Sequence, residues 1–165
     1  MPSPVSVPIR LDIENLAAPF SRALASLDAA TTRVLDDAKI EPPLRELIRI
    51  RASQLNGCSY CVDVHTTDAL NGGESVRRLA ALCVWRECGA FTTRERVALA
   101  FTESVTLAAS TRVPDDDFAA ARAEFDESEL AAVLALVVTI NAWNTIGVAA
   151  RPWPVDYATT EPDRG

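Results

Sequence analysis

Apolar residues recur at three- and four-residue steps along most of the chain, which is the pattern of helices that bury one face. Residues 19–38 predict the first such helix, whose repeating positions are Phe20, Leu24, Leu27, Val34 and Leu35. The next apolar face begins after Pro42-Pro43, and proline is tolerated in the first turn of a helix. It continues to Leu55 and ends at Asn56-Gly57, a typical stop signal.

Five further helices are predicted beyond this stop. The first covers residues 58–70 and is closed by Asn71-Gly72-Gly73, and the second covers residues 74–87. Thr92 and Glu95 have the spacing of a capping box before a helix that reaches Val105. Another helix opens at Pro114, and Ser128 is expected to cap a long last helix through residue 149. No strand pattern and no repeat appears, so the predicted fold class is all-α.

The 165 residues fit one domain, and 48% of them are hydrophobic. Pro2, Pro4 and Pro8 predict an extended segment over residues 1–14. The helical domain is expected over residues 15–150. Residues 151–165 contain Pro152-Trp153-Pro154 and are expected to form a proline-rich C-terminal arm.

The formal net charge of −7 argues against some partners. An acidic surface repels phosphate backbones and anionic lipid surfaces, so we expect no nucleic acid and no membrane partner. The chain begins without the basic and apolar regions of a signal peptide, and no apolar stretch approaches the ~20 residues of a membrane-spanning helix. We therefore expect a cytoplasmic protein, in which closely spaced cysteines are more often catalytic or metal-binding than structural.

Cys58 and Cys61 form a Cys-x-x-Cys motif directly after Gly57. Cys58 is therefore expected at a helix N-terminus, where free N–H groups and the helix dipole favour a thiolate. Cys61 lies one turn further on the same face. The spacing allows the two residues to cycle between a dithiol and a disulfide.

His65 and Glu46 are the candidate proton-transfer groups. His65 follows Cys61 by four residues, so its imidazole shares the face of the cysteines and can take the thiol proton. If the two helices fold back at Asn56-Gly57, Glu46 lies roughly 16 Å and His65 roughly 12 Å from the turn, at 1.5 Å per residue. The two side chains then lie at similar levels, which predicts a relay from carboxylate to imidazole to thiol.

Plainer interpretations exist for the same residues. Cys58, Cys61, His65 and Glu46 together offer four zinc ligands, although ligands so close on one helix constrain tetrahedral geometry. We expect no metal and no cofactor. The remaining residues of chemical interest are expected to be structural: Cys83 as a buried small residue, Cys88 at a helix end, Trp85, Trp143 and Trp153 in the core or at subunit contacts, and Asn141 and Asn144 as interface hydrogen bonders.

The spacing of Glu46, Cys58, Cys61 and His65 resembles the core motif of alkyl hydroperoxidase D-like (AhpD-like) proteins, within the carboxymuconolactone decarboxylase superfamily. The resemblance extends over about residues 15–150 and includes Leu55-Asn56-Gly57, Trp85-Arg86-Glu87, residues 94–99 and residues 140–144. It implies an all-helical bundle and peroxide reduction through the cysteine pair. By position, Cys61 would attack the peroxide, Cys58 would resolve the product, and Glu46 with His65 would form the relay.

One position departs from the family pattern. The founding peroxidase has a histidine just before the second cysteine, and this chain has Tyr60. A phenol with a pKa near 10 donates hydrogen bonds at neutral pH and is not a base, so the relay is shorter here.

These observations predict an antioxidant peroxidase that takes a hydroperoxide and an unidentified dithiol or protein electron donor. A general thiol–disulfide oxidoreductase and a non-enzymatic redox-sensing module are the alternatives. The resemblance also implies a homo-oligomer such as a trimer or hexamer. The last helix agrees, because apolar residues lie nearly all round it and need burial on most sides. They are Leu134, Leu136, Val137, Val138, Ile140 and Trp143.

Overall fold

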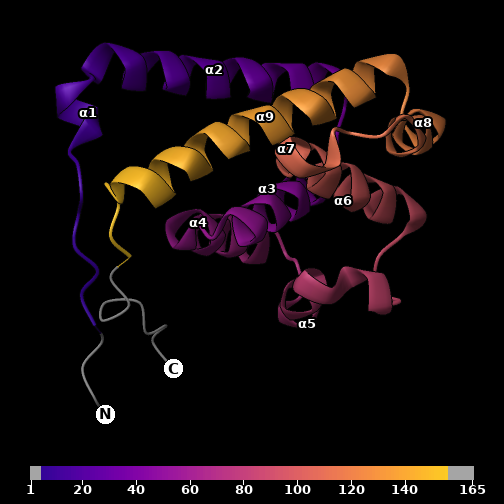
Figure 1. Cartoon of the computed structure of the whole chain (residues 1–165). Helices are drawn as coiled ribbons and strands as arrows, with labels where there is room; N and C mark the ends of the chain where they lie inside the picture. Colours follow the sequence, from indigo (N-terminus) through magenta and orange to yellow (C-terminus); the bar gives the residue numbers. More distant parts are fainter. Residues whose placement is uncertain (1–4, 156–165) are drawn as a thin grey trace.

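The structure, a computed structural model, describes residues 5–155, and within that range it is all-helical, as the sequence predicts (Figure 1). No strand is present among these residues. The elements, in chain order, are α1 (Ile13–Leu16), α2 (Ala18–Asp37), α3 (Pro42–Asn56), α4 (Ser59–Asn71), α5 (Val76–Ala81), the 3₁₀ helix η1 (Leu82–Glu87), α6 (Thr93–Thr106), α7 (Ala108–Thr111), α8 (Asp115–Glu124) and α9 (Glu127–Ala150).

Helix α3 lies in the middle of the bundle, where it packs against α4, α6 and α9 (Figure 1). Its first residue is Pro42, whose missing N–H is no loss in the first turn. Leu47, Ile48 and Ile50 are all at most 1% exposed, which shows that α3 is buried on more than one side. A central helix of this kind supplies a rigid base for the residues that it carries.

Helices α2 and α9 run side by side along one side of the bundle (Figure 1). Leu24 and Leu35 of α2 are buried, and the buried Thr31 hydroxyl lies 2.8 Å from that of Thr139 in α9. The predicted face of α2 was wider than the buried one. Only a narrow stripe of α2 contacts α9. The remaining residues of the predicted apolar face are therefore exposed, namely Phe20, Leu27 and Val34.

One predicted helix cap and one predicted helix differ from the structure. The cap of the last helix is Asp126, not Ser128: its side chain accepts from the Glu129 N–H, and Glu129 returns a bond to the Asp126 N–H. The predicted helix at residues 74–87 consists of α5 and η1, with non-helical dihedral angles at Val84. Cys83, expected to be buried, is exposed because η1 turns it outward, whereas Cys88 does lie at a helix end.

Helix α9 corrects the expectation that no segment has membrane-spanning length. The helix has 24 residues, and its most apolar 18-residue stretch has a mean hydropathy of 1.7, so by length and composition it is the one helix of the described residues that qualifies. Core helices pass the same criterion, and 44% of its most apolar stretch is buried. Leu136, Val137 and Ile140 are at most 3% exposed, whereas Val138 is 51% exposed, so the helix is buried on one side rather than all round.

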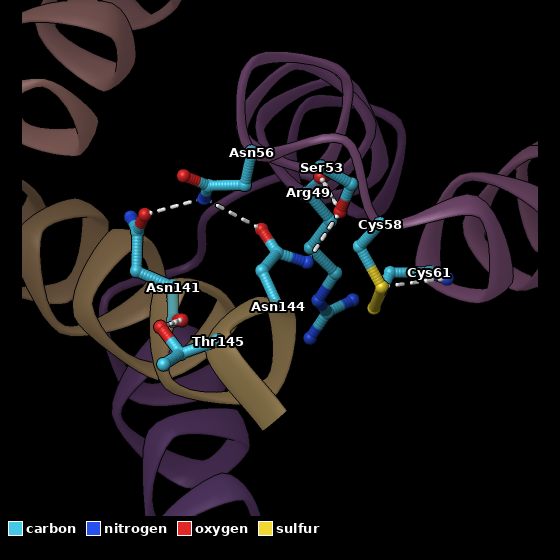
Figure 2. The surroundings of a disulfide bond; sticks show 8 residues. All are labelled: Arg49, Ser53, Asn56, Cys58, Cys61, Asn141, Asn144 and Thr145. Atoms are coloured by element: carbon cyan, nitrogen blue, oxygen red, sulfur yellow. Dashed lines mark hydrogen bonds between the residues drawn. A yellow bond between two sulfur atoms is a disulfide. The ribbon is translucent and has the colours of Figure 1, made fainter. Parts of the chain in front are cut away.

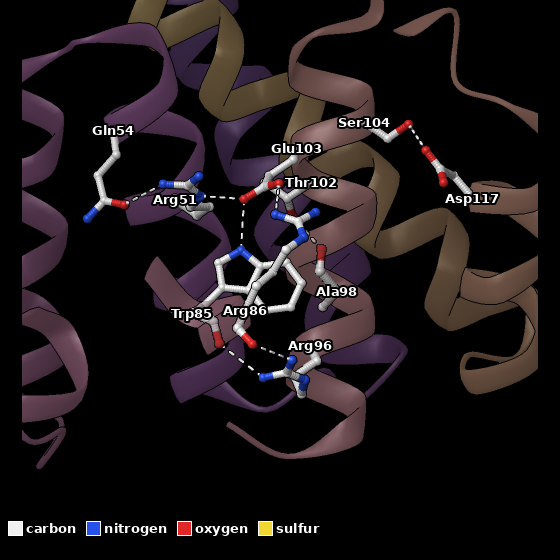
Figure 3. A network of polar contacts seen from close by, with 10 residues as sticks. All are labelled: Arg51, Gln54, Trp85, Arg86, Arg96, Ala98, Thr102, Glu103, Ser104 and Asp117. Carbon is white, nitrogen blue, oxygen red and sulfur yellow. Dashed lines mark hydrogen bonds and ion pairs between the residues drawn. The ribbon is translucent and has the colours of Figure 1, made fainter. Parts of the chain in front are cut away.

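A polar network ties η1 to α3 and α6 (Figure 3). The Glu103 carboxylate of α6 accepts hydrogen bonds from Arg51 Nε and Trp85 Nε1, both at 2.7 Å, and pairs with Arg86. Burial alone would raise the pKa of Glu103, but the bonds from Trp85, Arg86 and Arg51 outweigh it and lower the pKa. Trp85 itself is buried, in agreement with its predicted role in the core.

Candidate functional site

The cysteine pair follows a sharp chain reversal between α3 and α4. Gly57 ends α3 with φ of 73°, a left-handed conformation that glycine adopts without steric cost. Cys58 is the N-cap of α4, and its Sγ accepts a hydrogen bond from the Cys61 N–H at 3.3 Å. The expectation that Cys58 begins a helix is confirmed, and the sulfur faces the free N–H groups of that helix.

Cys58 and Cys61 form a disulfide, with their Cα atoms 5.4 Å apart (Figure 2). The two residues are only 2% and 4% exposed. They pack with Ala52 of α3 and Ile140 of α9 in a small apolar cluster. The disulfide is therefore held between three helices, and not displayed on a surface loop.

Glu46 and His65 meet across the α3–α4 pair. His65 Nδ1 lies 3.0 Å from Glu46 Oε2, and the other Glu46 oxygen pairs with Arg49. Burial alone would raise the pKa of Glu46, but the hydrogen bond from His65 and the positive charge of Arg49 outweigh it and lower the pKa. The carboxylate is therefore the stable form near neutral pH.

The charge state of Glu46 fixes the role of each nitrogen of His65. An ionised carboxylate only accepts hydrogen bonds, so the proton of a neutral His65 lies on Nδ1. Nε2 then keeps its lone pair and is the basic nitrogen of the ring. This arrangement orients the imidazole and leaves one nitrogen free to exchange a proton.

A cleft of about 480 Å³ brings the chemical groups together. Cys61, His65 and Arg49 line it, and aromatic side chains form much of the remaining wall. The ring centre of Trp153 lies 5.2 Å from that of Tyr60 and 5.6 Å from that of Trp143. The cleft therefore combines the cysteine, the oriented imidazole and an aromatic wall.

The chain after α9 contributes to this wall. Trp153 Nε1 donates a hydrogen bond to Glu14 Oε1 at 2.9 Å, and the Arg10 N–H donates to the Ala150 carbonyl at 2.9 Å. The first and last described segments are thus joined beside the cleft. Most of the predicted C-terminal arm, residues 156–165, lies outside the described residues, as do residues 1–4.

A network of amides fixes the end of α3 to α9 (Figure 2). Asn56 Nδ2 donates to Asn141 Oδ1 at 2.7 Å and to Asn144 Oδ1 at 3.0 Å. Asn144 Nδ2 donates to Ser53 Oγ at 2.9 Å, and Asn144 is fully buried. Both side chains bond within the chain, and the expectation of an interface hydrogen bonder is wrong for Asn144, because it is fully buried.

The residues that could hold a metal ion in the structure differ from the four zinc ligands considered from the sequence. Glu46, His65 and Asp68 have ligand atoms within 4.8 Å of one another, and neither cysteine belongs to this group. Both cysteine sulfurs are bonded to each other, and Arg49 already pairs with Glu46. These features disfavour the four-ligand zinc site considered from the sequence.

Several residues of the site were not predicted from the sequence. Arg49 follows Glu46 by three positions on α3, and this spacing was a usable signal for an ion pair. Trp143 and Trp153 were assigned to the core or to subunit contacts, but both line the cleft. Gly147 gave no signal at all, although the backbone of α9 approaches the disulfide at this residue.

Comparisons with known proteins agree with the fold and identify the family. Residues 18–104 match the profile of the carboxymuconolactone decarboxylase family. The chain is 40% identical over 112 residues to the uncharacterized protein YdfG of Bacillus subtilis (strain 168), covering 68% of this chain and 76% of YdfG.

Two crystal structures are similar over most of the chain. One is a protein of unknown function from Agrobacterium tumefaciens, named as a suggested antioxidant defence protein AhpD; the TM-score is 0.82 at 31% identity, covering 90% of this chain and 100% of that one. The other, from Ralstonia eutropha JMP134, is an uncharacterized peroxidase-related protein with an alkylhydroperoxidase AhpD core; the TM-score is 0.71 at 21% identity, covering 94% and 95%, which shows the shared fold. The chain therefore belongs to the carboxymuconolactone decarboxylase family, as an AhpD-like member.

Proposed function

We propose that this protein is an alkylhydroperoxidase-like antioxidant enzyme that reduces hydroperoxides with the Cys58–Cys61 dithiol. The observation that carries the proposal is the hydrogen bond between His65 and Glu46 beside the cysteine that lines the same cleft. A buried disulfide alone serves many proteins. Thiol activation requires an imidazole that is oriented by a third group, and here such an imidazole lines the same cleft as Cys61.

The first half of the cycle oxidises Cys61. His65 Nε2 takes the thiol proton, directly or through a water molecule, and the thiolate attacks the terminal oxygen of the hydroperoxide. The O–O bond breaks, Cys61 becomes a sulfenic acid, and the alkoxide takes the proton from His65 and leaves as the alcohol. The Glu46 carboxylate stabilises the imidazolium that exists between the two proton transfers.

The second half closes and reopens the disulfide. The Cys58 thiol attacks the sulfenic sulfur of Cys61, so that the S–S bond forms and water leaves. An external dithiol then reduces this bond by two thiol–disulfide exchanges and becomes a disulfide itself. One hydroperoxide and one external dithiol are consumed per cycle, and the two electrons of the dithiol reach the peroxide oxygen.

The alternative is a general thiol–disulfide oxidoreductase. Tyr60 favours this alternative, because a phenol beside the second cysteine supplies no base for the reaction with peroxide. The Tyr60 ring packs against Trp153 in the cleft. Both activities use the same cysteines. They differ in whether peroxide or another disulfide delivers the oxidising equivalents.

Turnover of tert-butyl hydroperoxide with dithiothreitol as the reductant tests the proposal. We expect peroxide consumption above the rate without protein, one alcohol formed per peroxide, and loss of two thiols per chain when peroxide is added to the prereduced protein alone. Cys83→Ser is the matched control, because Cys83 is an exposed free cysteine and its loss should leave the rate unchanged. Reduction of insulin disulfides without any peroxide turnover would instead support the general oxidoreductase.

We further propose that the chain assembles with copies of itself, as a trimer or hexamer. Phe20, Leu27 and Val34 follow one another at seven-residue intervals on α2 and are 42–53% exposed. Seven residues are close to two helical turns, so these side chains form one apolar stripe beside α9. A second copy of the chain is the partner that would bury it.

A further inference from the structure

Gly147 lies where the backbone of α9 comes closest to the disulfide. A Cβ atom built on Gly147 would lie 2.6 Å from Cys58 Sγ, which is closer than the contacts that Cβ atoms make in folded proteins. The same atom would lie at ordinary contact distance, 3.7 Å, from Cys61 Sγ and from Cζ3 of Trp153. The absent side chain therefore makes room for one sulfur in particular.

The backbone conformation does not explain a glycine at this position. Gly57 and Gly73 are the glycines with positive φ among the described residues, and Gly147 lies inside the regular helix α9. Within a helix, glycine is less favourable than alanine. Space beside the sulfur is the remaining physical reason for the residue.

The clash at residue 147 depends on the redox state of the pair. In the disulfide, Cys58 Sγ is tethered to Cys61 and cannot turn away. In the dithiol, the Cys58 side chain is free to rotate about its Cα–Cβ bond into another staggered position. A methyl group at residue 147 therefore destabilises the disulfide more than it destabilises the dithiol.

We propose that Gly147 is a positioning residue that sets the redox equilibrium of the Cys58–Cys61 pair by leaving space for the disulfide form. The inference rests on the proposed function in one respect, namely that the pair cycles between dithiol and disulfide. Gly147 touches no substrate and takes no part in proton transfer. Its effect is on how strongly the oxidised enzyme holds its disulfide before the external dithiol reduces it.

Equilibration of the full chain with mixtures of reduced and oxidised dithiothreitol measures this effect. The protein disulfide takes two electrons and two protons from dithiothreitol, which closes into its cyclic disulfide, and acid quenching with thiol alkylation counts both protein forms. We expect Gly147→Ala to shift the equilibrium about tenfold toward the dithiol, which is about 30 mV for a two-electron couple. Val148→Ala, at the next residue of α9 and 40% exposed in the wild type, should shift it less than twofold.

The outcomes separate the two proposals. A wild-type protein that forms no Cys58–Cys61 disulfide under any mixture would overturn the proposed function. A wild-type disulfide with an unchanged or more reducing potential in Gly147→Ala would overturn only the role of Gly147. A general loss of packing would lower the stability of both redox forms and leave the potential where it was.

If Gly147→Ala folds poorly, the same substitution can be tested in a second variant that lacks the Cys58 sulfur. Cys58→Ala removes the sulfur that the new methyl group would meet, so Gly147→Ala should lower the melting temperature much less in this background than in the oxidised wild type. An equal loss in both backgrounds would place the clash elsewhere and overturn the inference.

Discussion

His65 Nδ1 and Glu46 Oε2 lie 3.0 Å apart, although nineteen positions separate the two residues in the chain. The reversal at Gly57 folds α4 back on α3, and the two side chains then meet at the same level of the helix pair. Glu46 also pairs with Arg49, so the carboxylate is held from two sides. This contact orients the one histidine of the chain in the cleft that Cys61 lines.

The two cysteines should differ in their reaction with peroxide. Because Cys61 lines the cleft with His65, Cys61→Ser should abolish peroxide turnover, whereas Cys58→Ser should still permit a single oxidation of Cys61. Mass spectrometry after peroxide treatment and sulfenic-acid trapping will identify the oxidised residue. A sulfenic acid found on Cys58 in the Cys61→Ser variant, with none on Cys61 in Cys58→Ser, would reverse the assignment.

Loss of either relay residue should slow the reaction of the thiolate without unfolding the protein. Glu46→Gln and His65→Gln are each expected to reduce the rate of peroxide reduction by about 10² to 10⁴, the usual contribution of a positioned general base. Stopped-flow measurement on the prereduced protein gives this rate directly. Asp63→Asn is the control, because Asp63 lies on α4 but lines a different pocket from His65. Wild-type rates in both Glu46→Gln and His65→Gln would contradict the proposed relay.

Trp153 should control access to Cys61. Its ring packs against Tyr60 and Trp143, and aromatic pairs of this kind contribute about 0.5–1.5 kcal/mol each. Trp153→Ala should therefore raise the rate at which iodoacetamide alkylates reduced Cys61 by about three- to tenfold. Glu14→Gln, which weakens the hydrogen bond to the indole but keeps the ring, should act in the same direction and less strongly. Unchanged alkylation in Trp153→Ala would show that the ring does not cover the sulfur.

Glu103 should make the stability of the fold depend on pH. Its pKa is lower in the folded chain than the usual glutamate value of 4.5, so its contribution is fully present above that value and is lost as the pH falls through the folded-state pKa. Glu103→Gln should lose about 1–3 kcal/mol of unfolding free energy at pH 7 and show a flatter decline below about pH 4.5.

Urea unfolding at a series of pH values measures both quantities. Glu87→Gln serves as the control, because Glu87 is exposed and outside the network of Arg51, Trp85 and Arg86. Parallel pH profiles for Glu103→Gln and the wild type would show that the carboxylate charge contributes nothing to stability.

The apolar stripe on α2 should hold subunits together. Light scattering of the wild type at low micromolar concentration is expected to give a multiple of the 17.8 kDa chain mass. Leu27→Glu places a charge in the stripe and should reduce the mass toward that of the monomer, whereas Ala25→Glu on the far side of α2 should not. A wild-type mass near 17.8 kDa would contradict self-association, and an unchanged mass in Leu27→Glu would place the contact elsewhere.

The sequence determined the long helices and several of their ends, because these features depend on neighbouring residues. Proline at the start of α3, the Asn56-Gly57 stop and the Thr92–Glu95 capping box were all predicted and are all confirmed. The cap of α9 was missed by two positions, since Asp126 and Ser128 both offer a capping oxygen and only the backbone path distinguishes them. Local sequence alone also could not show that η1 turns Cys83 outward.

The cysteine motif and the pairing of His65 with Glu46 were also visible in the sequence, because Cys61 and His65 share a helix face and Glu46 lies at a matching distance from the turn. Tertiary structure alone decided what surrounds them. Asn144 reaches Ser53, Trp153 reaches Glu14, and Gly147 meets Cys58 across separations of roughly ninety to 139 positions. Such contacts depend on how α9 crosses the α3–α4 pair, and no spacing rule within one helix encodes that crossing.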